Sequence, residues 1–261
     1  MDDLIEKVGS FGRYQKGLLL IIGAVTGLNG ITQFVSVFNN AVPKLLCQYK
    51  KLNNSFDDDG PYLPNSCEIF KNISLSKENN QEPLYECRYD TTYYGRSVVT
   101  EYDLICDRLY LSSLTQTIFM VGSMTSFVSG YLSDQYGRKK VCLYICLLLF
   151  SSILISEIVQ IEYFNFSIDF KYSIYLLLSY MLGFTNFSLD IITYVLIIEF
   201  TTKRHVNFVT IFNMEMYVLG ELVLLLISYY FRDWHVHNWF VAGISLTLAL
   251  MIVTILPESP K

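Results

Sequence analysis

The chain has 261 residues, of which 52% are hydrophobic and 16% are charged, with a mean hydropathy of +0.36. A soluble domain carries about 25% charged residues, so this composition argues against an ordinary soluble fold and indicates a membrane protein. The formal net charge of −5 is mild, and the chain contains no long basic run that would indicate a nucleic-acid partner.

Six long apolar segments follow one another along the chain. A helix needs about 20 mostly apolar residues to cross a bilayer, and each segment approaches that length. Lipid offers the backbone no hydrogen-bond partners, so each segment is expected to be helical, and its continuous apolar character excludes a membrane β-barrel. The sequence therefore predicts an all-α membrane protein with six transmembrane helices, at 17–38, 109–131, 141–160, 172–197, 206–231 and 239–256.

Cationic residues orient these helices. Lys and Arg gather before the first helix, between the second and third, and between the fourth and fifth, whereas the short loops on the other side offer only Lys171 and Arg232. Under the positive-inside rule, the loops rich in Lys and Arg lie in the cytoplasm. The sequence therefore predicts that residues 1–16 and 257–261 are cytoplasmic. The first apolar segment has the length of a span and no signal-peptide pattern before it.

Residues 39–108 form one polar insert, which this topology places outside the cell. Two Asn-x-Ser patterns lie in it and a third follows the third helix, which gives candidate glycosylation sites at Asn53, Asn72 and Asn165. Four of the six cysteines also lie in the insert, and an even number in an oxidising compartment predicts two disulfides. Three pairings are open, and the alternative is four free thiols, at Cys47, Cys67, Cys87 and Cys106.

The segment between the second and third helices reads Gly-Tyr-Leu-Ser-Asp-Gln-Tyr-Gly-Arg-Lys-Lys, at residues 130–140. Its two glycines permit a tight turn, and its three adjacent cations mark the cytoplasmic side. The sequence predicts a short cytoplasmic loop at 132–140. The order Gly-x-Leu-Ser-Asp-x-x-Gly-Arg-Lys also resembles the loop signature of the major facilitator superfamily.

Further motifs flank the other helices. The stretch Ser-Val-Val-Thr-Glu-Tyr-Asp-Leu-Ile-Cys, at 97–106, precedes the second helix, and Pro-Glu-Ser-Pro, at 257–260, follows the sixth. With the large cysteine-bearing insert, these motifs closely resemble the organic cation/carnitine transporters, the solute carrier family 22 branch of that superfamily, over essentially the whole chain. The resemblance implies a twelve-helix architecture in which two six-helix halves enclose the substrate cavity.

The resemblance also implies that this chain is the N-terminal half. It ends where the cytoplasmic linker to the second half normally begins, and a single half exposes a cavity wall that needs a partner. We therefore expect an incomplete or truncated product, whose partner is the missing C-terminal six-helix half or a second copy of the chain. A naturally short product is the alternative.

Charged residues at the cytoplasmic helix ends are candidate gating residues. Asp134 is placed to pair with Arg138 or to meet the positive N-terminus of another helix. In the resembling family such a contact latches the two halves together at the cytoplasmic face. A second candidate cluster consists of Glu199, Arg204 and Glu258, and the alternative for both clusters is ordinary interfacial charge.

Polar residues at spacings of three and four form one face of the first helix, at Thr26, Asn29, Gln33, Ser36 and Asn40. A polar face is costly toward lipid, so this one is expected to face a water-filled cavity or another helix. Interhelical hydrogen bonds are the alternative to cavity lining, and both roles can hold together.

The fourth helix carries a carboxylate inside an apolar run. Asp190 lies one turn from Asn186 and one from Tyr194, and a charge at that depth costs roughly 2.5–3.5 kcal/mol on insertion scales. A carboxylate beside an aromatic ring suits an organic cation. The alternatives are a protonated Asp190 bonded to a neighbour, or a pair with a cation in the missing half. With polar positions of the first and fifth helices, the candidate substrate-binding residues are Asn29, Gln33, Asp190, Tyr194, Asn213 and Tyr217.

Three titratable residues lie toward the outer side. Glu157 is expected near the outer end of the third helix, where it reaches the lipid headgroups. His235 and His237 are expected in a short outer loop, with no metal-ligand pattern around them.

The motifs and the acidic groups at membrane depth predict a plasma-membrane transporter for small organic ions, cations favoured, that works by alternating access. The alternative substrate is an organic anion or a carnitine-like zwitterion. The alternative of another class is a non-transporting accessory or receptor-like membrane protein. The sequence contains no nucleotide-binding loop, catalytic triad or metal-ligand spacing, so we expect no enzyme, no cofactor and no metal.

Overall fold

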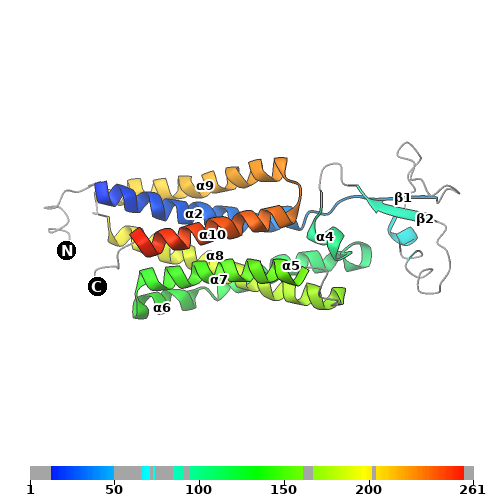
Figure 1. Cartoon of the computed structure of the whole chain (residues 1–261), viewed down its shortest axis with the longest axis horizontal. Helices are drawn as coiled ribbons and strands as arrows, with labels where there is room; N and C mark the ends of the chain where they lie inside the picture. The colour runs from blue at the N-terminus through cyan, green and yellow to red at the C-terminus, as the bar shows by residue number, and fades with distance from the viewer. Residues whose placement is uncertain are drawn as a thin grey trace.

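The computed structural model describes residues 13–49, 66–70, 73, 85–90, 95–160, 167–201 and 204–255. Its long helices run side by side along the longest axis of the molecule (Figure 1). These helices are α2 (Arg13–Asn39), α5 (Leu109–Met124), α6 (Phe127–Tyr136), α7 (Arg138–Gln160), α8 (Ile168–Glu199), α9 (Val206–Tyr230) and α10 (Trp234–Ile255).

The prediction of an all-α membrane fold is confirmed. Five helices of the described chain are long and apolar enough to cross a membrane, namely α2, α7, α8, α9 and α10. α2 begins and α10 ends at the same end of the bundle (Figure 1). We call that end the inner end, and the opposite end, where the polar insert lies, the outer end.

The second apolar segment differs from the single helix predicted at 109–131. It consists of α5 and α6, separated at Thr125 and Ser126. At this point the backbone N–H of Thr125 bonds to the Gly122 carbonyl and that of Ser126 to the Ser123 carbonyl, which are i to i−3 bonds. The Thr125 hydroxyl also donates to the Gly122 carbonyl at 2.7 Å. Hydroxyl side chains that bond back to the preceding turn compete with the helical ladder, which accounts for the break.

The structure also corrects the loop predicted at 132–140. Residues 132–136 continue α6 and residues 138–140 open α7, so Gly137 alone separates the two helices. Gly137 has a φ of 97°, a left-handed conformation that glycine adopts without strain. One such residue reverses the chain, and the neighbouring charges remain on helix ends.

Close helix contacts hold the bundle together. α2 packs against α8, α9 and α10. In addition, α5 packs against α8, and α7 packs against both α8 and α10. Glycines allow two of these approaches, because a Cβ on Gly220 of α9 would collide with the Gly27 carbonyl of α2, and a Cβ on Gly183 of α8 with the Phe119 carbonyl of α5. Small residues at helix contacts are typical of membrane bundles, where backbones approach closely.

The outer end carries a small structured part of the insert. β1 (Leu45–Tyr49) and β2 (Tyr85–Tyr89) form an antiparallel pair, which the sequence analysis did not predict. The short helix α4 (Val98–Glu101) begins at a capping box of Ser97 and Thr100, and the 3₁₀ turn η1 (Cys106–Arg108) follows it. Apolar residues of this segment pack against Tyr172 of α8 and Trp234 of α10, so α4 is docked on the bundle.

Candidate functional site

A cavity of about 980 Å³ opens between α2, α8 and α9, and we call it the central cavity. All six residues predicted to bind substrate line it, two from each helix: Asn29, Gln33, Asp190, Tyr194, Asn213 and Tyr217. The other residues that line it are Thr26, Asn186, Phe187, Ile191 and Met214. No Lys or Arg is among these lining residues. The described part of the wall therefore combines polar, aromatic and aliphatic side chains with one carboxylate.

The polar face of α2 both lines this cavity and bonds to neighbouring helices. Thr26 Oγ1 donates to Asn213 Oδ1 of α9 at 2.8 Å. Thr32 Oγ1 donates to Asn186 Oδ1 of α8 at 2.6 Å, and Asn186 Nδ2 donates to Gln33 Oε1 at 2.6 Å. The two roles that the sequence left open therefore coexist, because hydrogen bonds inside an apolar bundle satisfy polar groups that also border the cavity.

Asp190 presents its carboxylate to the central cavity. Its side chain is exposed, and no described side chain donates a hydrogen bond to it or forms an ion pair with it. Tyr194 and Tyr217 line the same cavity from α8 and α9. A carboxylate beside aromatic rings can hold an organic cation by charge attraction together with cation–π contact.

Three of the five candidate gating residues meet at the inner end. Arg138 Nη2 lies 2.7 Å from Glu199 Oε1 and 3.5 Å from Asp134 Oδ1. The Arg138 side chain is 15% exposed, and its Nη1 has no hydrogen-bond partner among the described residues. The close pair therefore joins the start of α7 to the end of α8, a contact that the sequence analysis did not propose.

The structure corrects the second predicted cluster. Glu199 pairs with Arg138, whereas Arg204 follows the end of α8 in the connection to α9 and forms no ion pair with a described residue. The difference arises because α7 packs against α8 and brings the first residue of one helix to the last residue of the other. Glu258 lies outside the described residues.

A hydrogen-bonded cluster at the outer end was missed by sequence reasoning. His235 Nδ1 lies 2.8 Å from Glu157 Oε2, and His235 Nε2 lies 3.2 Å from Glu101 Oε2. Trp234 Nε1 donates to Glu101 Oε2 at 2.9 Å, and Asn238 Nδ2 donates to Glu157 Oε1 at 2.7 Å. We call these five residues the outer cluster. It ties α4 of the insert to α7 and α10.

Two expectations are thereby corrected. His235 and His237 lie in the first two turns of α10 rather than in a loop, and Glu157 is buried rather than directed at headgroups. The signals in the sequence were a carboxylate within an apolar span and the i, i+3 spacing of His235 and Asn238 on one helix face. The spacing alone could not reveal the partners, which come from other helices.

The electrostatics of Glu101 follow from this cluster. Burial opposes ionisation of the carboxyl group, but hydrogen bonds from His235 and Trp234 and the charge of Arg96 outweigh burial and lower the pKa of Glu101.

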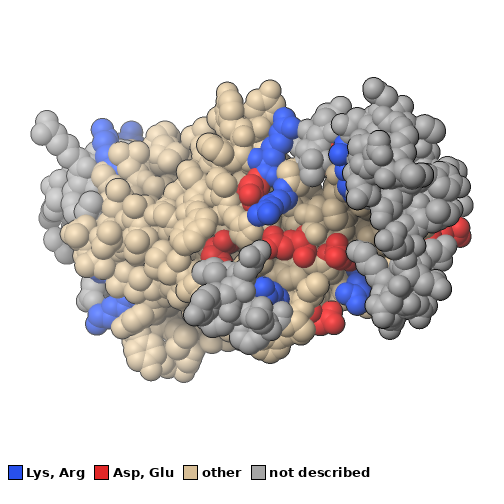
Figure 2. Space-filling model, turned by 45° about the vertical axis from the view of Figure 1, so that its right-hand side comes forward, with Lys and Arg blue, Asp and Glu red and all other residues tan. Residues whose placement is uncertain are grey.

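Figure 2 shows acidic atoms in a band across the part of the surface turned forward, with basic atoms on both sides of it. An open cavity of about 1490 Å³ borders the cluster and is lined by Glu101, Glu157 and His235 together with Tyr89, Arg96 and Trp239 among others.

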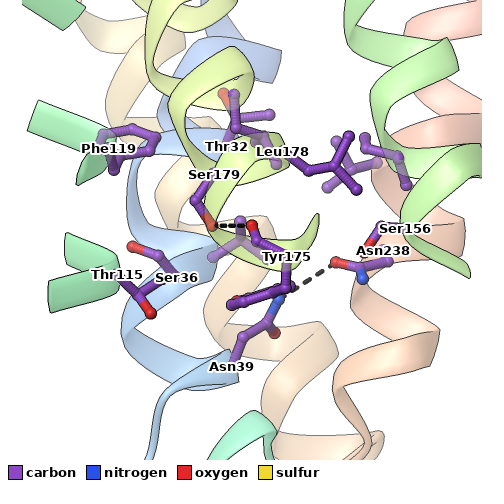
Figure 3. Close-up of a pocket in the computed structure, with 14 residues that line it drawn as sticks. Thr32, Ser36, Asn39, Thr115, Phe119, Ser156, Tyr175, Leu178, Ser179 and Asn238 are labelled. Atoms are coloured by element: carbon purple, nitrogen blue, oxygen red, sulfur yellow. Dashed lines mark hydrogen bonds between the residues drawn. The ribbon is translucent and has the colours of Figure 1, made fainter. Parts of the chain in front are cut away.

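A third cavity, of about 570 Å³, lies inside the bundle between α2, α5, α7, α8 and α10. Figure 3 shows Asn39 and Asn238 joined across it with Tyr175 beside them, and the bond from Asn39 Nδ2 to Asn238 Oδ1 measures 3.2 Å. Thr32 also lines this bundle cavity while it bonds to Asn186 of the central cavity. Thr32 therefore borders the bundle cavity on one side, and Asn238, which bonds to Glu157 of the outer cluster, borders it on another.

The predicted disulfides are confirmed, and the structure selects one of the three pairings. Cys47 is joined to Cys87, and Cys67 to Cys106. The β1–β2 register places Cys47 directly opposite Cys87. The candidate glycosylation sites Asn53, Asn72 and Asn165 lie outside the described residues.

Within the described ranges, no group of three or more His, Cys, Asp or Glu residues could hold a metal ion. Cys142 and Cys146 of α7 are buried free thiols in the apolar core.

The cavity and the helix arrangement can be compared with known proteins. The family model of the Major Facilitator Superfamily matches residues 106–261. Solute carrier family 22 member 21 of Mus musculus is 25% identical over all of this chain and 49% of its own length. An organic cation transporter-like protein of Drosophila melanogaster is 27% identical over all of this chain and 47% of its own length. Organic cation/carnitine transporter 2 of Homo sapiens is 25% identical over all of this chain and 50% of its own length.

The fold has a counterpart among solved structures. The crystal structure of a D-xylose–proton symporter superposes with a TM-score of 0.56 at 12% identity, over 93% of this chain and 48% of that one. The chain spans about half the length of the curated relatives it matches. These relatives are transporters, in agreement with the prediction of a transporter rather than an enzyme, and they confirm the resemblance carried by the motifs. The chain belongs to the Major Facilitator Superfamily.

Proposed function

We propose that the chain forms half of a transporter for small organic ions, with cations favoured, that works by alternating access. The observation that carries the proposal is Asp190, a carboxylate at membrane depth that faces the central cavity with no described side chain as partner. An intramembrane carboxylate is costly, and such residues mark substrate or ion pathways. Tyr194 and Tyr217 supply aromatic faces on the same wall.

Among the described residues that line the central cavity there is no Lys or Arg, which favours a cation over an anion. An anionic substrate would meet Asp190 with no positive charge from this half to offset the repulsion. A zwitterion would place its ammonium group near Asp190 and would require the cation for its carboxylate from another part of the transporter.

We place the inner end in the cytoplasm and the transporter in the plasma membrane. Lys and Arg gather in the connections at the inner end, as the positive-inside rule requires of cytoplasmic loops. We infer that Asp134, Arg138 and Glu199 contribute one side of a gate there. The other side of the gate would come from a second six-helix half or from a second copy of the chain.

Binding of a labelled organic cation tests the proposal. We would measure the affinity of the purified chain in lipid nanodiscs for radiolabelled tetraethylammonium, for wild type and for Asp190→Asn. Loss of a charge pair in a partly dry site should weaken binding tenfold or more, which corresponds to about 1.4 kcal/mol. Asp169→Asn is the control, because Asp169 is an exposed carboxylate at the outer start of α8.

Three outcomes separate the candidate functions. Equal affinity of wild type and Asp190→Asn would remove Asp190 from the site. Binding of labelled hippurate in place of the cation would favour the organic anion alternative. Stable expression with no binding of either probe, alone or with a second six-helix half, would favour the non-transporting accessory.

A further inference from the structure

One polar side chain of the central cavity differs from the others. Asn29 is 1% exposed, and neither its Oδ1 nor its Nδ2 has a hydrogen-bond partner among the described residues. The other amides that line the cavity are engaged, since Asn186 bonds to Gln33 and Asn213 accepts from Thr26. Of the described amides that line the cavity, Asn29 is therefore the one whose hydrogen-bonding atoms are both buried and without a partner.

The surroundings of Asn29 restrict where its amide can find a partner. Gly27 and Gly30 flank it on α2 and bring that helix against the backbone of α9, where a Cβ on Gly30 would collide with the Tyr217 carbonyl. Thr26 is already bonded to Asn213. Asn29 also lines the central cavity, together with Asp190.

A buried amide without partners is unfavourable, and a ligand that satisfies it recovers the lost interaction. Asn29 offers a donor, Nδ2–H, and an acceptor, Oδ1. A hydroxyl or carboxamide group both accepts and donates, so it can match both atoms. A carboxylate can match the donor only, and it would also be repelled by Asp190. An alkyl group matches neither.

We propose that Asn29 is a specificity-determining residue that selects organic cations carrying a hydroxyl or carboxamide group near the cationic nitrogen. Asp190 holds the charge and Asn29 recognises the second group. The inference rests on the proposed function, because it requires that a cation occupies the central cavity. It goes further by naming the chemical group that the cation must carry.

A matched pair of probes tests this selection. Choline and propyltrimethylammonium share the quaternary nitrogen and nearly the same size, but the hydroxyl of one is a methyl group in the other. Calorimetric titration of the chain in nanodiscs should give at least tenfold tighter binding of choline. Glycine betaine, which carries a carboxylate instead, should bind more weakly than choline.

Three variants assign the preference to its residue. Asn29→Leu should bring the ratio of the choline affinity to the propyltrimethylammonium affinity close to one, and an unchanged melting temperature would show that the variant is folded. Asp190→Asn should weaken both cations together. Asn40→Leu is the matched control. The Oδ1 of Asn40 is also buried with no partner among the described residues, but Asn40 is not among the residues that line the central cavity.

The outcomes distinguish failure of the inference about Asn29 from failure of the proposed function. Equal binding of choline and propyltrimethylammonium to wild type overturns the inference, as does a preference that survives Asn29→Leu. Both results leave the proposed function standing if Asp190→Asn still weakens both probes. If Asp190→Asn changes neither affinity, the proposed function fails and the inference fails with it.

Discussion

Glu157 Oε2 lies 2.8 Å from His235 Nδ1, across the contact between α7 and α10 and 78 residues apart in sequence. The other ring nitrogen of His235 faces Glu101 Oε2. Carboxylate oxygens accept hydrogen bonds, so both contacts are satisfied together only when both ring nitrogens carry a proton. One imidazole therefore joins the docked helix α4 to two helices of the bundle.

Removal of Glu157 should destabilise this outer end. Its side chain is 7% exposed, and truncation leaves His235 and Asn238 without their shared acceptor. We expect Glu157→Ala to lower the free energy of unfolding by about 3–5 kcal/mol, as for other broken buried pairs, and Glu157→Gln to cost less. SDS-induced unfolding in mixed micelles measures the difference. Asp169→Asn breaks the exposed Arg108–Asp169 pair and should change the free energy of unfolding by about 1 kcal/mol or less.

Acid should weaken the docking of α4. The pKa of Glu101 is lowered from its ordinary value of 4.5, so its ionised form is stabilised by folding. This stabilisation is fully present at pH values above the pKa of Glu101 in the unfolded chain. It is lost as the pH falls below 4.5 and passes through the lower pKa that Glu101 has in the folded chain. A titration of melting temperature between pH 7 and pH 3 should show the loss. Glu101→Gln should flatten this part of the profile, and a profile identical to wild type would contradict the assignment.

The inner ion pair should show charge-swap rescue. Arg138→Glu alone should destabilise the chain by roughly 1.5–3 kcal/mol, because Glu199 then faces a like charge in a mostly buried setting. Adding Glu199→Arg restores opposite charges and should recover a large part of the loss. The coupling free energy from the double-mutant cycle is the measured quantity. Strictly additive effects would show that the two side chains do not interact.

The disulfide pairing predicts a defined peptide map. Proteolysis without reductant should yield Cys47 linked to Cys87 and Cys67 linked to Cys106, identified by mass spectrometry. Cys47→Ser with Cys87→Ser opens a link between residues 40 apart and should destabilise the insert by about 4 kcal/mol in the chain-entropy model. Cys142→Ser is the control, since Cys142 is a free thiol of the bundle.

Gly220 should tolerate no side chain. A Cβ there would collide with the Gly27 carbonyl of α2, so Gly220→Val should separate α2 from α9 and deform the central cavity. The expected result is a loss of thermal stability of several degrees together with loss of cation binding. Gly243→Ala is the matched control, because a Cβ on Gly243 has nothing within 4 Å. Removal of a helical glycine there should be neutral or slightly stabilising.

Short-range patterns in the sequence were sufficient to predict many of the residues that line the central cavity. Thr26, Asn29 and Gln33 share a face of α2 because the helical repeat brings residues three and four apart together, and all three line the central cavity. Asp190 was identified for a similar reason, since a carboxylate inside an apolar run is unusual wherever the helix packs. The break at Thr125 and the single-residue turn at Gly137 were not anticipated, because they depend on backbone hydrogen bonds and on one unusual φ angle.

The sequence by itself determined which segments enter the membrane, which residues share a helix face and which superfamily motifs the chain carries, because these follow from composition and short-range periodicity. Only the tertiary structure decided that Glu157 meets His235, that Arg138 meets Glu199 and that Cys47 pairs with Cys87. It also decided that Asn29 has no hydrogen-bond partner in the part of the chain that the structure describes. Each of these facts depends on which helices or strands pack together and in what register. Such contacts join residues far apart in the chain, so no local pattern encodes them.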